Sequence, residues 1–431
     1  MVQLLLLLLL LILPIIFLHL TKNHKKSPTE ARVPPGPPGF PVIGNLHHLA
    51  AASDAPHLYL HHLSKKYGPI VRMGLGPKPM LVVSSAKLAE QVMKAQDLAF
   101  CGRPKSLGQQ RLSYDCSDIA FSSYDEYWRE VRKITTIHLF SAKKTQFFRP
   151  VREDEMARFV ARISARITAR PEASGRQAVN LSEMAIELGS TLICRIAFGK
   201  RYEEGGPEMR RFDGLLKRAQ AVMAAFYVSD YFPVFGWVDR LRGSNIFIAA
   251  TDTSSASIVW TMTALKKAPQ VDEDDLPKLS YMKAVINEVF RLYPPAPLLV
   301  PRETIEKCTL DGYEVQPKTI VYINAWAIAR DPEFWEKPNE FLPERFLESK
   351  IEIKGHDFGV IPFGAGRRSC PGMFMGLVNV ELTVANLLYS FDWELPRGVR
   401  VEDVDTEGLP GITVHKKNPL LLVPKRCNNV T

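Results

Sequence analysis

Residues 361–372 read IPFGAGRRSCPG, and this glycine-rich loop is the most informative segment of the 431-residue chain. Cys370 directly precedes Pro371 and an apolar segment of helical periodicity, so Pro371 is expected at the first position of a helix and Cys370 at its N-terminus. The helix dipole at such an end stabilises a thiolate. The glycines allow a flat ligand to approach, Phe363 can cover the sulfur, and Arg368 offers a guanidinium to a carboxylate. These features suit a haem iron held by a cysteine.

Two further motifs place charged residues at helical spacing. Glu288 and Arg291 are three residues apart, within reach of an ion pair on one helix face. Trp128 and Arg132 place an aromatic ring and a cation four residues apart. Taken singly, each motif has an ordinary explanation, a surface ion pair or an amphipathic surface helix.

A fourth motif lies inside an apolar helix predicted over 244–268. It reads AATDT, residues 249–253, and places Asp252 beside Thr253. Buried acids and hydroxyls are costly without partners, so both should be hydrogen-bonded or take part in chemistry. The simpler explanation is a threonine whose hydroxyl bonds to the carbonyl of Ala249.

The four motifs together resemble those of the cytochrome P450 superfamily. The family's cysteine-ligand signature, F-x-x-G-x-R-x-C-x-G, is matched at every fixed position by Phe363, Gly366, Arg368, Cys370 and Gly372. The resemblance implies that Cys370 is the axial ligand of the iron of haem b and that the other four residues lie against this cofactor.

The resemblance also implies roles for the remaining motifs. The pair Glu288 and Arg291 is similar to the family's ExxR, and with Arg345 of the segment 343–346, PERF, it implies a structural ion-pair network. The family's WxxxR and a less specific arginine imply that the haem propionates are reached by Trp128, Arg132 and Arg302.

The acid and alcohol motif implies catalysis. Asp252 and Thr253 match the family residues that deliver protons during oxygen activation, whereas Ala250 stands where the family has glycine. The implied reaction is insertion of oxygen into a small lipophilic or aromatic metabolite. The substrate-facing positions implied by the resemblance, each also explicable as plain core, are Phe121, Ala249, Leu299 and Ile412.

Periodicity predicts a mostly helical body with small peripheral β-sheets, an α+β fold, and the resemblance implies a single haem domain over 45–431. Helices are predicted over 84–97, 123–135, 151–169, 182–198, 207–226, 244–268, 280–292 and 373–390. Short β-branched runs predict strands over 70–73, 81–83, 319–323 and 420–423.

The N-terminal segment predicts a membrane anchor. Residues 1–20 are uncharged and long enough to cross a bilayer, 21–33 form a basic linker, and 34–44 form a proline-rich hinge. Because the positive charges follow the apolar segment, the body is expected in the cytosol. A cleaved signal peptide is the alternative. Resemblance to the plant microsomal A-type group implies the endoplasmic reticulum membrane.

Composition limits the partners. Lys and Arg number 55 against 46 Asp and Glu, a net charge of +9, which favours anionic partners such as lipid headgroups or an acidic protein. Charge alone does not exclude nucleic acid, but the resemblance implies none. The sequence has no FAD, FMN or NADPH motif, so the resemblance implies electrons from NADPH through the NADPH–cytochrome P450 reductase. The six cysteines show neither a disulfide framework nor zinc-site spacing.

The chain is shorter than expected for this family, and two segments look cut, near 243/244 and near 270/271. The first cut would remove part of the cover over the substrate pocket. The alternative to an active monooxygenase is therefore an inactive shortened isoform that is at most a membrane-tethered haem-binding protein. A haem-thiolate isomerase or dehydratase is a weaker alternative, because such enzymes tend to lose the acid and alcohol kept here.

Overall fold

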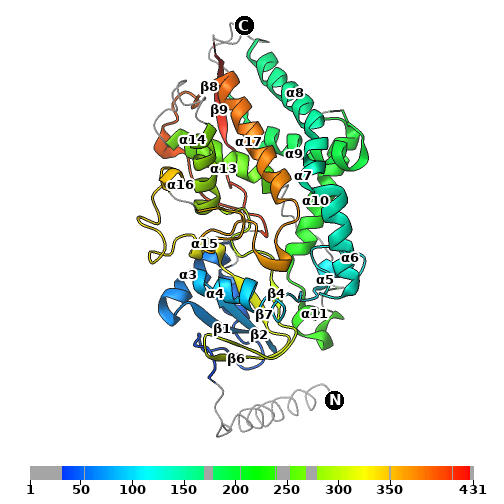
Figure 1. Ribbon diagram of the computed structural model, residues 1–431, viewed down its shortest axis with the longest axis vertical. Helices are drawn as coiled ribbons and strands as arrows, with labels where there is room; N and C mark the ends of the chain where they lie inside the picture. The colour runs from blue at the N-terminus through cyan, green and yellow to red at the C-terminus, as the bar shows by residue number, and fades with distance from the viewer. Residues whose placement is uncertain are drawn as a thin grey trace, which may run out of the picture.

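The computed structural model describes residues 32–52, 54–168, 178–203, 205–237, 239, 253–267, 279–348, 351–409 and 411–427. Several predictions fall outside these ranges and concern the segment 1–20, Ala249, Asp252 and the junctions 243/244 and 270/271. The described chain forms a helical part and a sheet-rich part (Figure 1).

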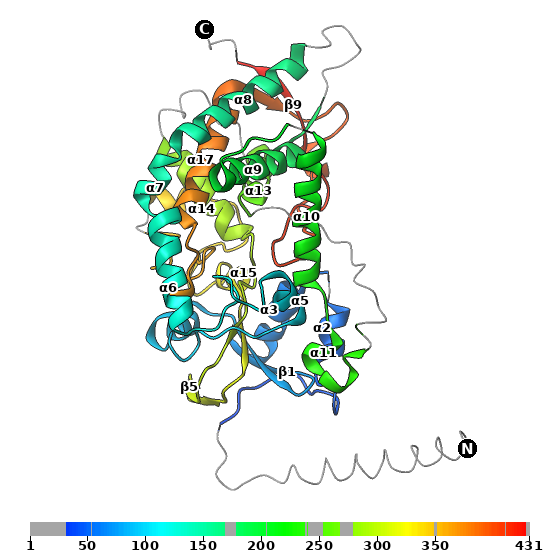
Figure 2. The same ribbon diagram turned by 90° about the vertical axis from the view of Figure 1, so that its right-hand side faces the viewer.

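The helices dominate the fold, as the periodicity predicts. They are α2 (Leu46–Ala51), α3 (Pro56–Tyr67), α4 (Ala86–Glu90), α5 (Leu107–Leu112), α6 (Glu126–Thr135), α7 (Ala142–Phe147), α8 (Arg149–Thr168), α9 (Leu181–Phe198), α10 (Pro207–Ala224), α11 (Val228–Tyr231), α13 (Thr253–Lys267), α14 (Leu279–Leu292), α15 (Ala325–Ile328), α16 (Arg345–Glu348) and α17 (Met373–Ser390). In the view of Figure 2, α6 and α7 lie on one side and α10 on the other.

Three small sheets complete the fold. The strands are β1 (Ile70–Leu75), β2 (Lys78–Val83), β3 (Val179–Asn180), β4 (Arg302–Glu303), β5 (Cys308–Leu310), β6 (Tyr313–Val315), β7 (Ile320–Ile323), β8 (Phe391–Glu394) and β9 (Leu421–Arg426). They form a four-stranded sheet in the order β1-β2-β7-β4, a three-stranded sheet in the order β3-β9-β8 and the pair β5-β6. The predicted fold class, mostly helical with small sheets, is confirmed.

The main core lies between helices distant in sequence. On α13, Ile258 and Met262 are buried together with Leu188 of α9 and Val380 of α17. The hydroxyl of Ser255 is also buried and donates to the carbonyl of Ala185, 2.9 Å away, which satisfies a polar group in an apolar interface.

Helix α17 is apolar for a structural reason. Within the described ranges it is the one helix long and apolar enough to cross a membrane by length and composition alone. Its residues Val380, Val384 and Leu387 are, however, buried in the main core, where they contact neighbouring helices. The apolar character of α17 is therefore explained by core packing.

Candidate active site

The cysteine loop precedes α17 and differs in detail from the prediction. Gly372 is the N-cap of α17, so the α-helix begins at Met373 and not at Pro371. The prediction for Pro371 was wrong because the two residues after Cys370 form a turn. The thiol of Cys370 is exposed, while its backbone N–H donates to the carbonyl of Phe363 over 2.9 Å.

Gly366 is required by the protein's own packing. Its φ is +69°, and a Cβ there would lie 2.1 Å from the carbonyl oxygen of Met93 and 2.9 Å from the carboxylate of Asp97. Close approach of the chain itself therefore requires a glycine here, and the contact of Gly366 with a flat ligand stays a prediction. A side chain at position 366 would displace the loop that carries Cys370.

The loop meets the start of α13 on the surface of α17. A Cβ at Gly376 would be 3.8 Å from the hydroxyl of Ser254 and 3.9 Å from the ring of Phe363. Thr253, the first described residue of α13, is exposed, and its carbonyl accepts a hydrogen bond from Ser257. Ser254, the neighbour of Thr253, and Phe363 of the cysteine loop therefore both lie against α17. The alternative explanation for Thr253, a hydrogen bond from its hydroxyl to the carbonyl of Ala249, concerns a residue outside the described ranges.

Arg368 is fixed in place behind the loop. Its guanidinium lies 4.1 Å from the centroid of the Trp128 ring. Its Nε donates to the carbonyl of Cys101 and its Nη2 to that of Ser122, each over 2.8 Å. Its Nη1 is buried and has no hydrogen-bond partner within the described ranges. This orphaned donor marks a place where an acceptor is missing.

The WxxxR motif lies beside the loop, but its tryptophan N–H is already used. Trp128 Nε1 donates to the carbonyl of Ile119 over 3.0 Å, and its contact with a propionate stays a prediction. Arg132 Nη2 donates to the carbonyl of Ser369 over 2.7 Å, next to Cys370. Burial lowers the pKa of Arg132, and the nearby Cys370 opposes that shift.

Arg302 is buried beside the same loop. Its Nη1 forms an ion pair with Asp97 over 2.9 Å, and its Nη2 donates to the carbonyl of Ala365. Asp97 also accepts from the backbone N–H and from Nη1 of Arg367. Asp97 thereby ties Arg302 to the loop that precedes Cys370.

Arg103 belongs to this group, although the sequence analysis did not select it. Its Nε donates to Ala120 and its Nη1 to Val300 and Pro301, all through carbonyl oxygens at 2.7 to 2.9 Å. Burial, reinforced by Arg302 and Arg368, lowers the pKa of Arg103 well below its usual value. The guanidinium is therefore held where its positive charge is costly.

The charge balance of this group fits a dianionic cofactor. Arg103, Arg302 and Arg368 are 7%, 4% and 8% exposed, and Asp97 is the one carboxylate paired with them in the described ranges. Buried charges are stable only when paired and hydrogen-bonded. The surplus positive charge and the orphaned Nη1 of Arg368 thus suit the two propionates of haem, with Cys370 exposed beside them.

The ExxR pair and the PERF arginine come together as a buried network. Arg291 Nε and Nη2 each lie 2.7 Å from a carboxylate oxygen of Glu288, and both side chains are 0% exposed. Arg345 Nε lies 3.3 Å from Glu288 Oε1, which also accepts from the backbone N–H of Leu342. The network joins α14 to α16 and to the chain before it.

Three of the four predicted substrate positions line one cavity. Phe121, Leu299 and Ile412, from three distant segments, surround a volume of about 500 Å³. Met223 and Phe226, at and just after the end of α10, line it as well. A cavity of this size and mainly apolar lining suits a small organic molecule.

Comparisons with known proteins agree with this geometry. A family model described as Cytochrome P450 matches residues 34–244 and 240–423. The 6,7,8-trihydroxycoumarin synthase of Pastinaca sativa is 42% identical over 495 residues, covering 96% of this chain and 97% of that protein. Strychnine-11-hydroxylase of Strychnos nux-vomica is 39% identical, covering 96% of this chain and 95% of that protein.

A solved structure shows the same fold at lower identity. A zebra fish cytochrome P450 determined with abiraterone superposes with a TM-score of 0.68 at 22% identity. The match covers 87% of this chain and 99% of that chain.

Proposed function

Because this chain belongs to the cytochrome P450 family, we propose that it is a membrane-anchored monooxygenase that inserts one oxygen atom of O2 into a small aromatic metabolite. The observation that carries the proposal is the buried arginine group beside Cys370, which has a surplus of positive charge and an unpaired donor on Arg368. Such a group is stable only when an anion completes it.

Different residues are proposed to hold the haem and to support its chemistry. Haem, when bound, supplies the oxygen chemistry through an iron held by a thiolate, here that of Cys370. Arg103, Arg302 and Arg368 neutralise and orient the propionates. Thr253, together with Asp252 outside the described ranges, would hold and move the protons that the oxygen chemistry requires.

The substrate proposed is a flat plant metabolite. The cavity around Phe121, Leu299 and Ile412 supports it, because these apolar side chains select by shape and exclude water from the reacting group. The relatives' names support it as well, since they describe synthases of coumarin-type compounds and a strychnine hydroxylase.

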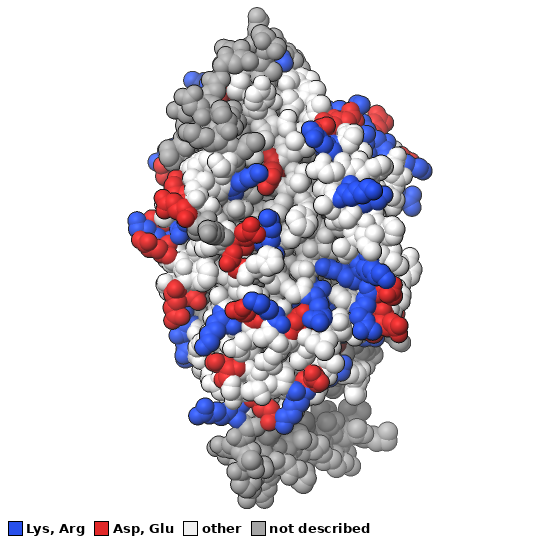
Figure 3. Space-filling model, in the orientation of Figure 1, with Lys and Arg blue, Asp and Glu red and all other residues white. Residues whose placement is uncertain are grey.

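The electrons are proposed to come from an NADPH–cytochrome P450 reductase that docks over α6 and the cysteine loop. Figure 3 shows Lys and Arg side chains gathered there. Arg129, Lys133 and Arg367 are exposed in this region, and an acidic partner would be steered toward them. Docking at this face would bring the electron donor close to Cys370.

The membrane attachment is supported by exposed apolar side chains beside the β1–β2 turn. They are called the apolar end here and comprise Phe40, Val42, Ile43, Val234, Phe235 and Trp237, which are 40% to 84% exposed. The two stretches meet at this turn, since the N–H of Gly76 donates to the carbonyl of Ile43, and a Cβ at Gly76 would lie 2.8 Å from the ring of Phe232. Exposed apolar groups gathered at one end indicate contact with lipid. The endoplasmic reticulum is the proposed membrane.

The carbon monoxide difference spectrum of the reduced protein tests the proposal. A strongly red-shifted Soret band is expected for the full chain, because the gas binds opposite a cysteine thiolate. Cys370→Ser should lose that band, while Cys427→Ser, a matched change far along the chain, should keep it. A band typical of neutral ligation in the unmodified chain would refute the proposal.

A second candidate function is that of a haem-binding protein with little turnover. Two observations favour it. The family match is in two pieces that meet at 240–244, the first place where the sequence looks cut, and the alignment to the coumarin synthase spans 495 residues although this chain has 431. Such an alignment needs gaps within this chain. A red-shifted band without substrate turnover in the presence of reductase would support this candidate.

A further inference from the structure

A second cavity lies next to the proposed substrate cavity. It has a volume of about 720 Å³ and is lined by α3 and the residues before it, the start of α15, the middle of α13, the end of α14 and residues 406–409, 414 and 417. It shares Asp54, His57, Pro297 and Val414 with the cavity around Ile412, so the two are neighbours across these residues. It contains neither Cys370 nor any arginine assigned above to the haem.

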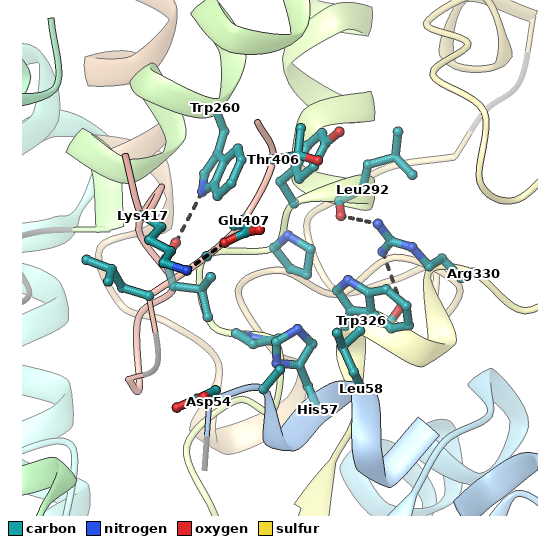
Figure 4. Close-up of a pocket in the computed structure, with 17 residues that line it drawn as sticks. Asp54, His57, Leu58, Trp260, Leu292, Trp326, Arg330, Thr406, Glu407 and Lys417 are labelled. Atoms are coloured by element: carbon teal, nitrogen blue, oxygen red, sulfur yellow. Dashed lines mark hydrogen bonds and ion pairs between the residues drawn. The ribbon is translucent and has the colours of Figure 1, made fainter. Parts of the chain in front are cut away.

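Aromatic rings from α3, α13 and α15, and one from the residue directly after α14, line this cavity. Trp260 stacks on Tyr293 with ring centroids 4.8 Å apart and planes only 4° from parallel, and its indole N–H donates to the carbonyl of Val414. Across the cavity, the ring of Trp326 contacts His57 at 5.7 Å (Figure 4). Flat, preformed aromatic walls favour a planar ligand, because stacking adds to the gain from apolar burial.

Arg330 supplies a cation without a carboxylate partner. Its guanidinium lies 3.9 Å from the centroid of Trp326, and its Nη2 donates to the carbonyl of Leu292 over 2.5 Å. A guanidinium has five N–H donors, and within the described ranges no carboxylate forms an ion pair with this one. Burial, together with Arg291, lowers the pKa of Arg330 to about 9, so its charge is poorly compensated.

The other ionisable groups of the cavity leave Arg330 as the favoured position for an anion. Burial and Arg330 itself lower the pKa of His57 to about 4, so this imidazole is neutral at pH 7. Glu407 is paired with Lys417 over 2.7 Å. Figure 4 shows that pair and Asp54 on the side of the cavity opposite Arg330. The cavity is therefore polarised, with its unpaired positive charge at one end.

We propose that this cavity, named here the Arg330 cavity, is a second small-molecule site that binds a planar aromatic carboxylate, with the carboxylate on Arg330 and the ring between the aromatic walls. A guanidinium holds a carboxylate through two parallel hydrogen bonds, which a neutral ligand cannot replace. The inference goes beyond the proposed monooxygenase activity. The ligand comes either from substrate or product passing to the neighbouring cavity, or from a separate effector.

Isothermal titration calorimetry of the full chain in lipid nanodiscs tests the proposal, with 2-naphthoate as the probe and neutral 2-naphthamide as its matched analogue. Naphthoate should bind at least 10-fold more tightly than the amide. Arg330→Met should remove this preference. Leu58→Trp, which fills the cavity from its exposed edge and leaves Arg330 in place, should weaken both ligands at least 10-fold. Lys65→Met, on α3 outside the cavity, is the control.

Equal binding of the two probes, or binding that neither Arg330→Met nor Leu58→Trp changes, would overturn the proposal, as would the absence of binding. These titrations do not need haem, so their result is separate from the carbon monoxide spectrum. A competition experiment with naphthalene distinguishes the two sources of the ligand. Binding of naphthalene in the haem cavity of the haem-loaded chain is followed through the Soret band. Competition between naphthoate and naphthalene would indicate a ligand in transit, and independent binding would indicate an effector.

Discussion

Arg291 and Glu288 form a two-bond ion pair that is fully withdrawn from solvent, with both N···O distances at 2.7 Å. The remaining donors of Arg291 extend the network, because Nη1 also donates to the carbonyls of Ala329 and Pro338. The pair therefore joins α14 to a segment about forty residues further along the chain. This geometry makes it a structural element and not a reacting group.

Glu288→Gln should destabilise the chain strongly. The change keeps the shape but leaves a buried guanidinium without its counter-charge, which costs about 3 to 5 kcal/mol. The free energy of unfolding, measured by urea denaturation, checks this. Glu344→Gln is the matched control, because the side chain of Glu344 accepts a surface hydrogen bond from Tyr281, and it should cost less than about 1 kcal/mol. Equal losses in the two variants would contradict the prediction.

Arg103→Met should weaken retention of haem, because the cofactor's propionates lose one of their buried cations. We expect haem transfer to apomyoglobin to become at least 10-fold faster than in the unmodified chain. Arg72→Met, an exposed arginine on β1, should leave the transfer rate unchanged. If Arg103→Met releases haem at the unmodified rate, the assignment of Arg103 to the propionates is wrong.

Arg103 also shows why part of the site could not be predicted from the sequence. Its carbonyl partners at Val300 and Pro301 are 197 and 198 residues away, and no local spacing reveals such a contact. The cysteine loop and the pair at 288 and 291 were recognisable because their residues are close in sequence. The available signal for Arg103 was its position in the segment FCGRP, 100–104, where an arginine follows an apolar run.

The start of α17 was predicted two residues too early, and the packing role of Gly366 was not predicted. At Gly366, Met93 and Asp97, about 270 residues earlier, occupy the space that a Cβ would take, a long-range contact that local spacing does not reveal. The helix start was expected at Pro371, whereas the turn after Cys370 moves it to Met373. Helix spans such as 182–198, observed as Leu181–Phe198, were predictable because they depend on periodicity within one segment.

His57 should make the fold sensitive to mild acid. The pKa of His57 is about 4 in the folded chain, below its ordinary value of 6.5, which applies to the unfolded chain. The unfolded chain therefore takes up the proton first as pH falls. The stability that neutral His57 preserves is present above pH 6.5 and is lost between pH 6.5 and 4, with a difference of about 2 kcal/mol between pH 7 and 5.

Urea unfolding at pH 7 and pH 5 checks this, with His57→Gln expected to reduce the pH dependence by that amount. His138→Gln, at an exposed position after α6, serves as the control and should leave it unchanged. An unaltered pH dependence in His57→Gln would show that another group is responsible.

Charge reversal at α6 should slow electron delivery. In the double variant Arg129→Glu and Lys133→Glu, an acidic reductase would be repelled, so we expect at least a 10-fold slower reduction of the haem at low salt and a weaker dependence on ionic strength. Reduction by dithionite should be unaffected. Lys65→Glu with Lys66→Glu, on α3, is the matched control. Equal rates in both double variants would place the docking face elsewhere.

Trp237 should lie within the lipid if the apolar end contacts the membrane. Its side chain is 58% exposed in the described structure, whereas Trp128, Trp260, Trp335 and Trp393 are at most 8% exposed. In nanodiscs made with brominated phospholipid, part of the tryptophan fluorescence should therefore be quenched. Trp237→Phe should abolish that quenching, and Trp326→Phe, which removes the half-buried ring of the Arg330 cavity, should preserve it. Quenching that survives Trp237→Phe would mean that the lipid contacts another surface, and the membrane orientation proposed here would have to be abandoned.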